Sequence, residues 1–127
     1  FIGNRFDVER YYQAFDCFVF PSTFEGLPGS VAEAQASGLR CLVSDQVTRE
    51  AALTELVTYK GIGEPAADWA AEIMRGAQRA PERRDMREAI AAKGFDVRLQ
   101  AAKMEAFYAG GVKPPGAITR ACMKKGE

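Results

Sequence analysis

The sequence predicts an α/β fold, in which a small parallel sheet is flanked by helices and the C-terminal part is helical. A short apolar run at residues 18–20 stops at Pro21, and a glycine-containing loop then leads into a helical stretch rich in alanine. Two further apolar runs, at residues 40–44 and 56–59, have the length of short strands. The chain of 127 residues is long enough for one domain.

Residues 21–38 point most directly to function. Gly26 and Gly29 permit an abrupt turn and let a ligand come close to the backbone. The free N–H groups and the dipole at the start of the following helix favour an anion such as a diphosphate. Glu25 and Glu33 would repel phosphate, but carboxylates accept hydrogen bonds well from sugar or ribose hydroxyls.

Both glutamates also have a plain structural interpretation. Ser30 and Glu33 have the spacing of a capping box, and these residues alone favour a helix cap. Glu25 alone would be a solvated loop residue. A cap, however, requires none of Glu25, Gly26 and Pro28, so the complete segment favours a ligand site.

The neighbouring turns give further expectations. Gly38 is expected to end the helix in a left-handed conformation. Asp45 follows the strand at 40–44, where doubly wound sheets place ligand contacts, but Asp is also common in turns and caps, and we interpret it as structural. Thr48 is expected to be a simple cap for a helical turn at residues 48–53.

The second half of the chain is predicted to be mainly helical. A helix begins near Asp68, and its Trp69 and Ile73 lie one turn apart, which favours packing over a role for Trp69 as a sugar-stacking platform. The mixed charges at residues 82–88 predict a solvated helix face rather than a phosphate clamp. Residues 110–127 begin with glycines and prolines and are expected to form a flexible tail.

Composition excludes several classes of function. The 17 basic and 17 acidic residues cancel, so nothing favours a nucleic-acid partner. The chain has no apolar run long enough to span a bilayer and no signal peptide, so we expect a cytoplasmic protein, either free or peripheral at the inner face of the membrane. It has no histidine and no Asp-x-Asp, so we expect no metal. Cys17, Cys41 and Cys122 lack the spacing of a disulfide framework or a zinc site.

The order of residues in 21–38 resembles the nucleotide-sugar signature of the retaining glycosyltransferases called family 4. The matching features are Pro-Ser at 21–22, Glu-Gly-x-Pro at 25–28, a second glutamate after seven intervening residues, and Ala-x-Ala-x-Gly ending at Gly38. Flanking segments that support the resemblance are residues 1–3, 16–22, 41–45, 93–97 and 103–108. The likeness covers residues 1–109 and is strongest to capsule and exopolysaccharide glycosyltransferases.

The resemblance implies a fold and an activity. Family members have the GT-B fold of two facing Rossmann-like domains, and residues 1–109 resemble the latter part of the C-terminal, donor-binding domain. The implied enzyme transfers a hexose with retention from a UDP- or GDP-linked sugar to a glycan or glycolipid. It uses no cofactor beyond the donor. The departing diphosphate would be stabilised by preorganised donors.

The family's site residues carry over to the matching positions. Glu25 would contact the donor sugar as the catalytic residue, and Gly26, Leu27 and Pro28 would line the sugar pocket. Pro28 has no N–H group, so it can contribute only shape. Glu33 would bind the ribose hydroxyls.

The chain also departs from the family pattern. It opens at Phe1, and from the resemblance we expect it to lack the acceptor-binding domain and the first strands of the donor domain, with their basic residues. Asn4 and Arg5 would lie near the nucleobase. Residues 1–3 would form the third strand of the family's sheet, and the strand that normally lies beside it would be missing. The strand at 17–20 would then expose an apolar edge, which favours self-association or pairing with residues 1–3.

Two hypotheses follow. The chain is either part of a retaining glycosyltransferase, inactive alone because the acceptor is positioned by the N-terminal domain, or a non-catalytic half-domain or subunit that binds a nucleotide sugar and needs a partner chain. The upstream reading frame would separate them, since an in-frame continuation with the missing strands contradicts the subunit hypothesis.

Overall fold

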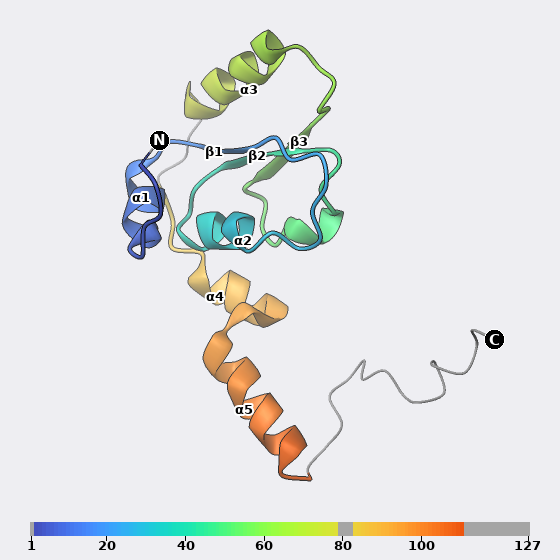
Figure 1. Ribbon diagram of the computed structural model, residues 1–127. Helices are drawn as coiled ribbons and strands as arrows, with labels where there is room; N and C mark the ends of the chain where they lie inside the picture. Colours follow the sequence, from blue (N-terminus) through green and yellow to red (C-terminus); the bar gives the residue numbers. More distant parts are fainter. Residues whose placement is uncertain (1, 79–82, 111–127) are drawn as a thin grey trace, which may run out of the picture. The chain divides into compact units, whose positions relative to one another are not determined.

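The structure, a computed structural model, describes residues 2–78 and 83–110 (Figure 1). It falls into two compact units, Phe1–Lys93 and Gly94–Glu127, which are described separately. The first unit holds a three-stranded parallel sheet flanked by helices, and this confirms the predicted fold class. The domain boundary predicted at residue 109 stays a prediction, and the predicted tail lies outside the described residues from position 111 onward.

The sheet consists of β1 (Phe18–Phe20), β2 (Cys41–Ser44) and β3 (Val57–Lys60) in the order β1-β2-β3. In the register, Phe18 lies beside Cys41, which lies beside Val57. All four residues of the central strand β2 are buried. The three apolar runs of the sequence therefore became the three strands, within one residue at each end.

The helices of the first unit cover both faces of this sheet (Figure 1). They are α1 (Val8–Ala14), α2 (Gly29–Ala36), the 3₁₀ turn η1 (Arg49–Ala51), α3 (Ala66–Gln78) and α4 (Arg87–Ile90). The core lies on the α2 side, where alternate strand residues point inward. Its buried members are Tyr12, Val31, Ala34, Leu39, Cys41, Val43, Val47 and Ala51.

The end of α2 confirms the predicted left-handed stop. Gly38 has a φ of 70°, and its N–H donates to the Gln35 carbonyl over 2.9 Å. A Cβ at this position would lie 2.1 Å from the Arg84 carbonyl oxygen. Only glycine fits here, because both the backbone angle and the neighbouring chain exclude a side chain.

Two predictions about the outer elements are confirmed. Trp69 of α3 is only 8% exposed, and its indole Nε1 donates to the Gly61 carbonyl over 3.1 Å, so it packs and offers no platform to a sugar. Thr48 caps η1 by accepting from the Glu50 N–H. It has no capping-box partner, as expected.

Two other predictions are wrong. Ile2 and Gly3 do not form a strand: Gly3 has a φ of 69°, which breaks extended structure, and no neighbouring strand offers them a ladder. Phe1 lies outside the described residues. The charged run is not a continuous helix either, since residues 83–86 are non-helical and α4 begins at Arg87, while Glu82 lies outside the described residues.

The second unit is helical as far as it is described. The segment η2 (Ala91–Phe95) is interrupted at Gly94, which has a φ of 93°, and α5 (Val97–Tyr108) follows. The Asp96 carboxylate caps α5 by accepting from the Arg98 N–H over 2.8 Å. Across the described residues, no helix combines the length and the apolar character needed to cross a membrane.

Candidate functional site

The predicted signature occupies the exit of β1. After β1 the chain turns at Pro21, forms the loop at residues 21–28, and enters α2 at Gly29. Because β1 is parallel to β2, this loop lies at the carboxyl edge of the sheet, which is where open α/β sheets bind ligands. The strand, loop and helix predicted from the sequence are therefore all present.

Glu25 is held in this loop rather than free in solvent. Its side chain is half-buried, and the Ser22 hydroxyl lies 3.0 Å from its Oε1 atom. Its backbone pairs with Val47 through a single parallel β-bridge. The solvated-loop interpretation of Glu25 is thus wrong, because both its backbone and one carboxylate oxygen have protein partners.

The three residues after Glu25 lead into the helix. Gly26 is exposed, and a Cβ added there would meet nothing within 4 Å. Leu27 is 49% exposed, whereas Pro28 is buried at the N-cap of α2. The open space beside Gly26 leaves room for a ligand to approach the loop backbone.

The start of α2 excludes the capping box. The first helical hydrogen bonds run from the Val31 and Ala32 N–H groups to the Pro28 carbonyl, so Ser30 already lies inside the helix. No side chain caps this end. Pro28 holds the N-cap position with an extended backbone, φ −72° and ψ 112°, and the helix begins at Gly29, before Ser30. The N–H groups of Gly29 and Ser30 come before the first of these bonds, so they have no acceptor within the helix, as at any helix start.

Glu33 lies one turn further along α2 and is paired with Tyr12 of α1. The buried Tyr12 hydroxyl donates to Glu33 Oε2 over 3.2 Å. Burial, followed by the negative charge of Glu33, raises the pKa of Tyr12 to about 12. Tyr12 therefore stays protonated and fixes the exposed carboxylate of Glu33. No sequence pattern indicates this contact, because the two residues are 21 positions apart.

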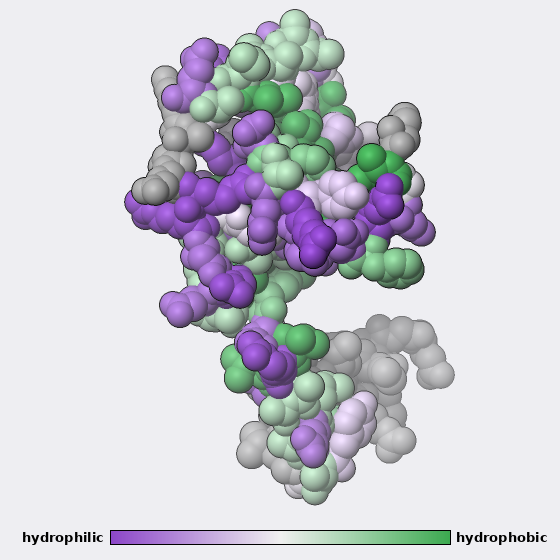
Figure 2. Space-filling model, turned by 90° about the vertical axis from the view of Figure 1, so that its left-hand side faces the viewer, coloured by the Kyte–Doolittle hydropathy of each residue, from purple (hydrophilic) through white to green (hydrophobic). Residues whose placement is uncertain are grey.

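Glu33 also lines a hollow of about 790 Å³ between α1, α2 and the chain around Arg83. The side of the first unit on which α1 lies is largely hydrophilic (Figure 2). Arg83, Arg84 and Arg87 line the same hollow. Glu9 and Asp85 line it as well, so the hollow combines three carboxylates with three basic side chains. Such a lining can accept hydrogen bonds from hydroxyl groups and donate them to an anionic group.

Two of these arginines already have protein partners. Arg83 donates to the Tyr12 carbonyl over 3.2 Å and also to the Gln13 and Phe15 carbonyls, which places a positive charge at the C-terminal end of α1. Arg87 binds Asp85, and its hydrogen bonds lower the pKa of Asp85 to about 2. The sequence suggested neither contact.

The remaining site candidates stay apart. Glu25 and Glu33 are held by different neighbours, Ser22 and Tyr12 respectively. Asn4 and Arg5 are exposed before α1 and do not line the hollow at Glu33. Within residues 2–78 and 83–110, no three acidic or cysteine side chains gather as a metal site would require.

Comparison with known proteins adds independent evidence. Residues 1–80 match the family described as "Glycosyl transferases group 1". The chain is 40% identical over 100 residues to "Putative glycosyltransferase EpsF" of Bacillus subtilis (strain 168). The aligned residues cover 77% of this chain and 26% of that protein. It is 46% identical over 44 residues to "UDP-Gal:alpha-D-GlcNAc-diphosphoundecaprenol alpha-1,3-galactosyltransferase" of Escherichia coli, covering 35% of this chain and 11% of that protein.

The chain therefore spans about a quarter of the length of the first relative and about a tenth of the second. No solved structure gave a significant match.

Proposed function

The chain belongs to the group 1 glycosyl transferase family, and from this premise we propose that it forms part of the donor-binding domain of a retaining GT-B glycosyltransferase. The donor is a nucleotide-diphosphate sugar, and the complete enzyme transfers its hexose to a glycan or glycolipid bound by an N-terminal domain. The names of the two relatives, one a galactosyltransferase acting with UDP-Gal on a diphosphoundecaprenol-linked sugar, support a surface polysaccharide or lipid-linked acceptor. We also propose that the protein acts in the cytoplasm or at the inner face of the membrane, and the lipid-linked substrate in the name of the second relative is compatible with the latter.

The observation that carries this proposal is the placement of Glu33. Its carboxylate is oriented by Tyr12 and borders a hollow that Ala36 and Ser37, at the C-terminal end of α2, also line. A carboxylate held in this way can accept both hydroxyls of a ribose. The N–H groups at the start of α2 would bind the diphosphate, so the proposed site needs no metal.

The sugar end of the site is assigned to Glu25. Glu25 lies in the loop that follows β1, and the open space beside Gly26 gives a sugar access to this loop. Leu27 and Pro28 complete the proposed sugar pocket, and Asn4 and Arg5 are proposed to approach the base. Glycosyl transfer itself needs the acceptor to be positioned, so the chain alone is expected to bind the donor without transferring the sugar.

Calorimetric titration tests this function. UDP- and GDP-linked sugars are titrated into the monomeric chain, its Glu33→Ala variant, and a Glu50→Ala control, whose glutamate is exposed on η1. Hydrogen bonds to a charged group contribute about 1.5–3 kcal/mol, so losing Glu33 should weaken binding at least about tenfold. Glu50→Ala should bind like the wild type. Equal binding by all three proteins, or none by a folded wild type, would contradict the proposed site.

A second candidate function is a non-catalytic donor-binding subunit that pairs with another chain. One observation favours it: within the described residues, β1 has a strand neighbour on one side only, and Val19 on this edge is 38% exposed. Sedimentation analysis separates the two functions, because a subunit of this kind should form a defined complex through β1, whereas part of a larger enzyme should not.

A further inference from the structure

Three loops leave the carboxyl edge of the sheet, and the structure links them in series. The loop after β1 carries Glu25, and its backbone pairs with Val47 in the loop after β2. Val47 closes a tight turn, because its N–H donates to the Ser44 carbonyl over 3.1 Å. Val47 is also 2% exposed and belongs to the core. The position of the Glu25 backbone therefore depends on this turn.

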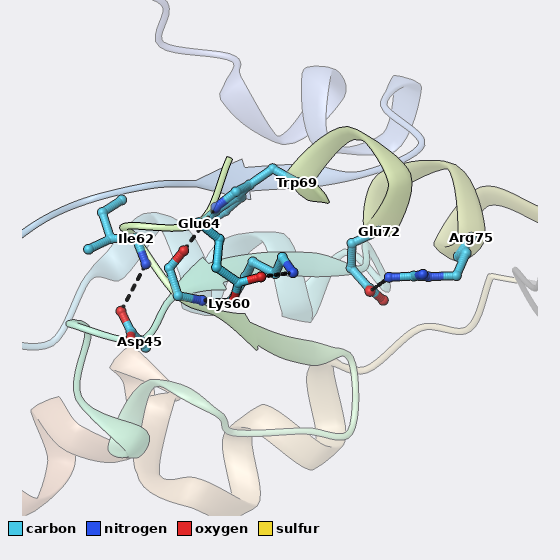
Figure 3. A network of polar contacts seen from close by, with 8 residues as sticks. Asp45, Lys60, Ile62, Glu64, Trp69, Glu72 and Arg75 are labelled. Carbon is cyan, nitrogen blue, oxygen red and sulfur yellow. Dashed lines mark hydrogen bonds and ion pairs between the residues drawn. The ribbon is translucent and has the colours of Figure 1, made fainter. Parts of the chain in front are cut away.

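Asp45 fixes the turn to the third loop. Its side-chain Oδ1 accepts from the Ile62 N–H over 3.1 Å and from the Gln46 side chain over 3.1 Å. Its own N–H donates to the Lys60 carbonyl over 2.9 Å. The hydrogen bond from Gln46, followed by that from Ile62, lowers the pKa of Asp45, so the carboxylate is charged at neutral pH. Figure 3 shows Asp45 pointing at the Ile62 backbone.

The loop that receives Asp45 is itself firmly held. Glu64 accepts from the Gly61 N–H over 3.0 Å and forms an ion pair with Lys60 (Figure 3). The indole of Trp69 donates to the Gly61 carbonyl from the other side. The Ile62 N–H is thus presented from a fixed loop, and Asp45 joins the turn at residues 44–47 to this loop.

We infer that Asp45 is a positioning residue for Glu25. It touches no part of the proposed ligand, and it acts through the turn that ends at Val47 and through the bridge from Val47 to Glu25. The expected effect of Asp45 on the binding of a sugar nucleotide rests on the proposed function. The mechanical link between the loops can be tested without any ligand.

The test compares Asp45→Ala and Asp45→Asn with the wild type. The alanine variant loses the acceptor for the Ile62 N–H, whereas the asparagine variant keeps a side-chain oxygen at the same place. Asp96→Ala serves as the matched control, since Asp96 also accepts from backbone N–H groups but belongs to the second unit. All four proteins are measured by amide hydrogen exchange and by titration with UDP- and GDP-linked sugars.

We expect Asp45→Ala to speed amide exchange in residues 24–27 about tenfold and to weaken sugar-nucleotide binding by a similar factor, as loss of one charge-assisted hydrogen bond would. Asp45→Asn should restore part of both readings, because its amide oxygen accepts the hydrogen bond without a charge, and Asp96→Ala should change neither. Unchanged exchange at 24–27 in Asp45→Ala would overturn the inference. If the wild type binds no sugar nucleotide, the proposed function fails, and the exchange measurement alone still decides whether Asp45 positions Glu25.

Discussion

The buried side chain of Gln35 offers a strong test of what holds α2 in place. Gln35 is 0% exposed, and its amide joins α2 to the segment between η1 and β3. Its Nε2 donates to the Val31 carbonyl over 3.0 Å and to the Ala51 carbonyl over 2.8 Å. Its Oε1 accepts from the Thr54 N–H over 2.9 Å and from the Thr54 hydroxyl over 3.0 Å.

The change Gln35→Met removes all four bonds while keeping nearly the same side-chain length. The Ala51 carbonyl and the Thr54 N–H would then lose their side-chain partner. Each buried polar group left unsatisfied costs about 1–3 kcal/mol. Thr54 is half-buried, so water can partly replace its bond, and we expect a loss of about 2–4 kcal/mol in the free energy of unfolding. This is a large part of the roughly 5–15 kcal/mol of an ordinary domain.

Urea unfolding followed by the fluorescence of Trp69 measures this loss. The matched control is Gln13→Met, because Gln13 is exposed on α1. The control should unfold within about 0.5 kcal/mol of the wild type, as surface substitutions usually do. If Gln35→Met also stays within that margin, the buried amide does not anchor α2, and the reasoning from its four bonds is refuted.

Two further predictions concern Tyr12 and Gly38. The folded-state pKa of Tyr12, about 12, lies above its ordinary value of 10.0, so its contribution to stability is complete below pH 10 and is lost as the pH rises toward 12. In urea titrations at alkaline pH, the free energy of unfolding of Tyr12→Phe should therefore fall less than that of the wild type between pH 10 and 12. Tyr108 is 77% exposed, so the control Tyr108→Phe should follow the wild type. Gly38→Ala should destabilise by at least about 2 kcal/mol, because it combines a left-handed φ with a backbone clash. Gly63→Ala, with open space around it, should differ little in melting temperature, and equal melting of both glycine variants would contradict the steric argument.

Features that depend on short stretches of sequence were predicted well. The strands followed from apolar runs bounded by breakers, and the left-handed Gly38 followed from its place after a helix. Trp69 was correctly assigned to packing because the helical period put it on the same face as Ile73. In each case the sequence signal is a local pattern, although partners from distant segments complete the structure.

The capping box, which the complete segment had already disfavoured, is not formed, because α2 begins at Gly29 and Ser30 lies inside it. One prediction did fail where a local pattern permits two structures. Residues 1–3 have strand-forming side chains, yet a strand also needs a neighbour, and the described Ile2 and Gly3 have none. Propensity alone cannot supply a missing partner.

Contacts between distant segments were not predicted at all. Arg83 binds the carbonyl of Tyr12, 71 positions earlier, and no periodicity in a single sequence encodes such a pair. The same holds for the bridge between Glu25 and Val47. The two glutamates could be selected from the signature, but the groups that hold them become visible only in the folded chain.

These distant contacts give the two glutamates separate supports. Glu33 lies on α2. This helix is fixed to α1 by the hydrogen bond from Tyr12, and to Ala51 at the end of η1 by the hydrogen bond from Gln35. Glu25 depends instead on the turns at the carboxyl edge, through Val47 and Asp45. These polar supports differ, but Tyr12 and Val47 also pack in one buried core. A change to a polar contact at one end therefore tests that end of the proposed site better than a change in the shared core, and would allow binding studies to assign the ribose and sugar ends to their own parts of the fold.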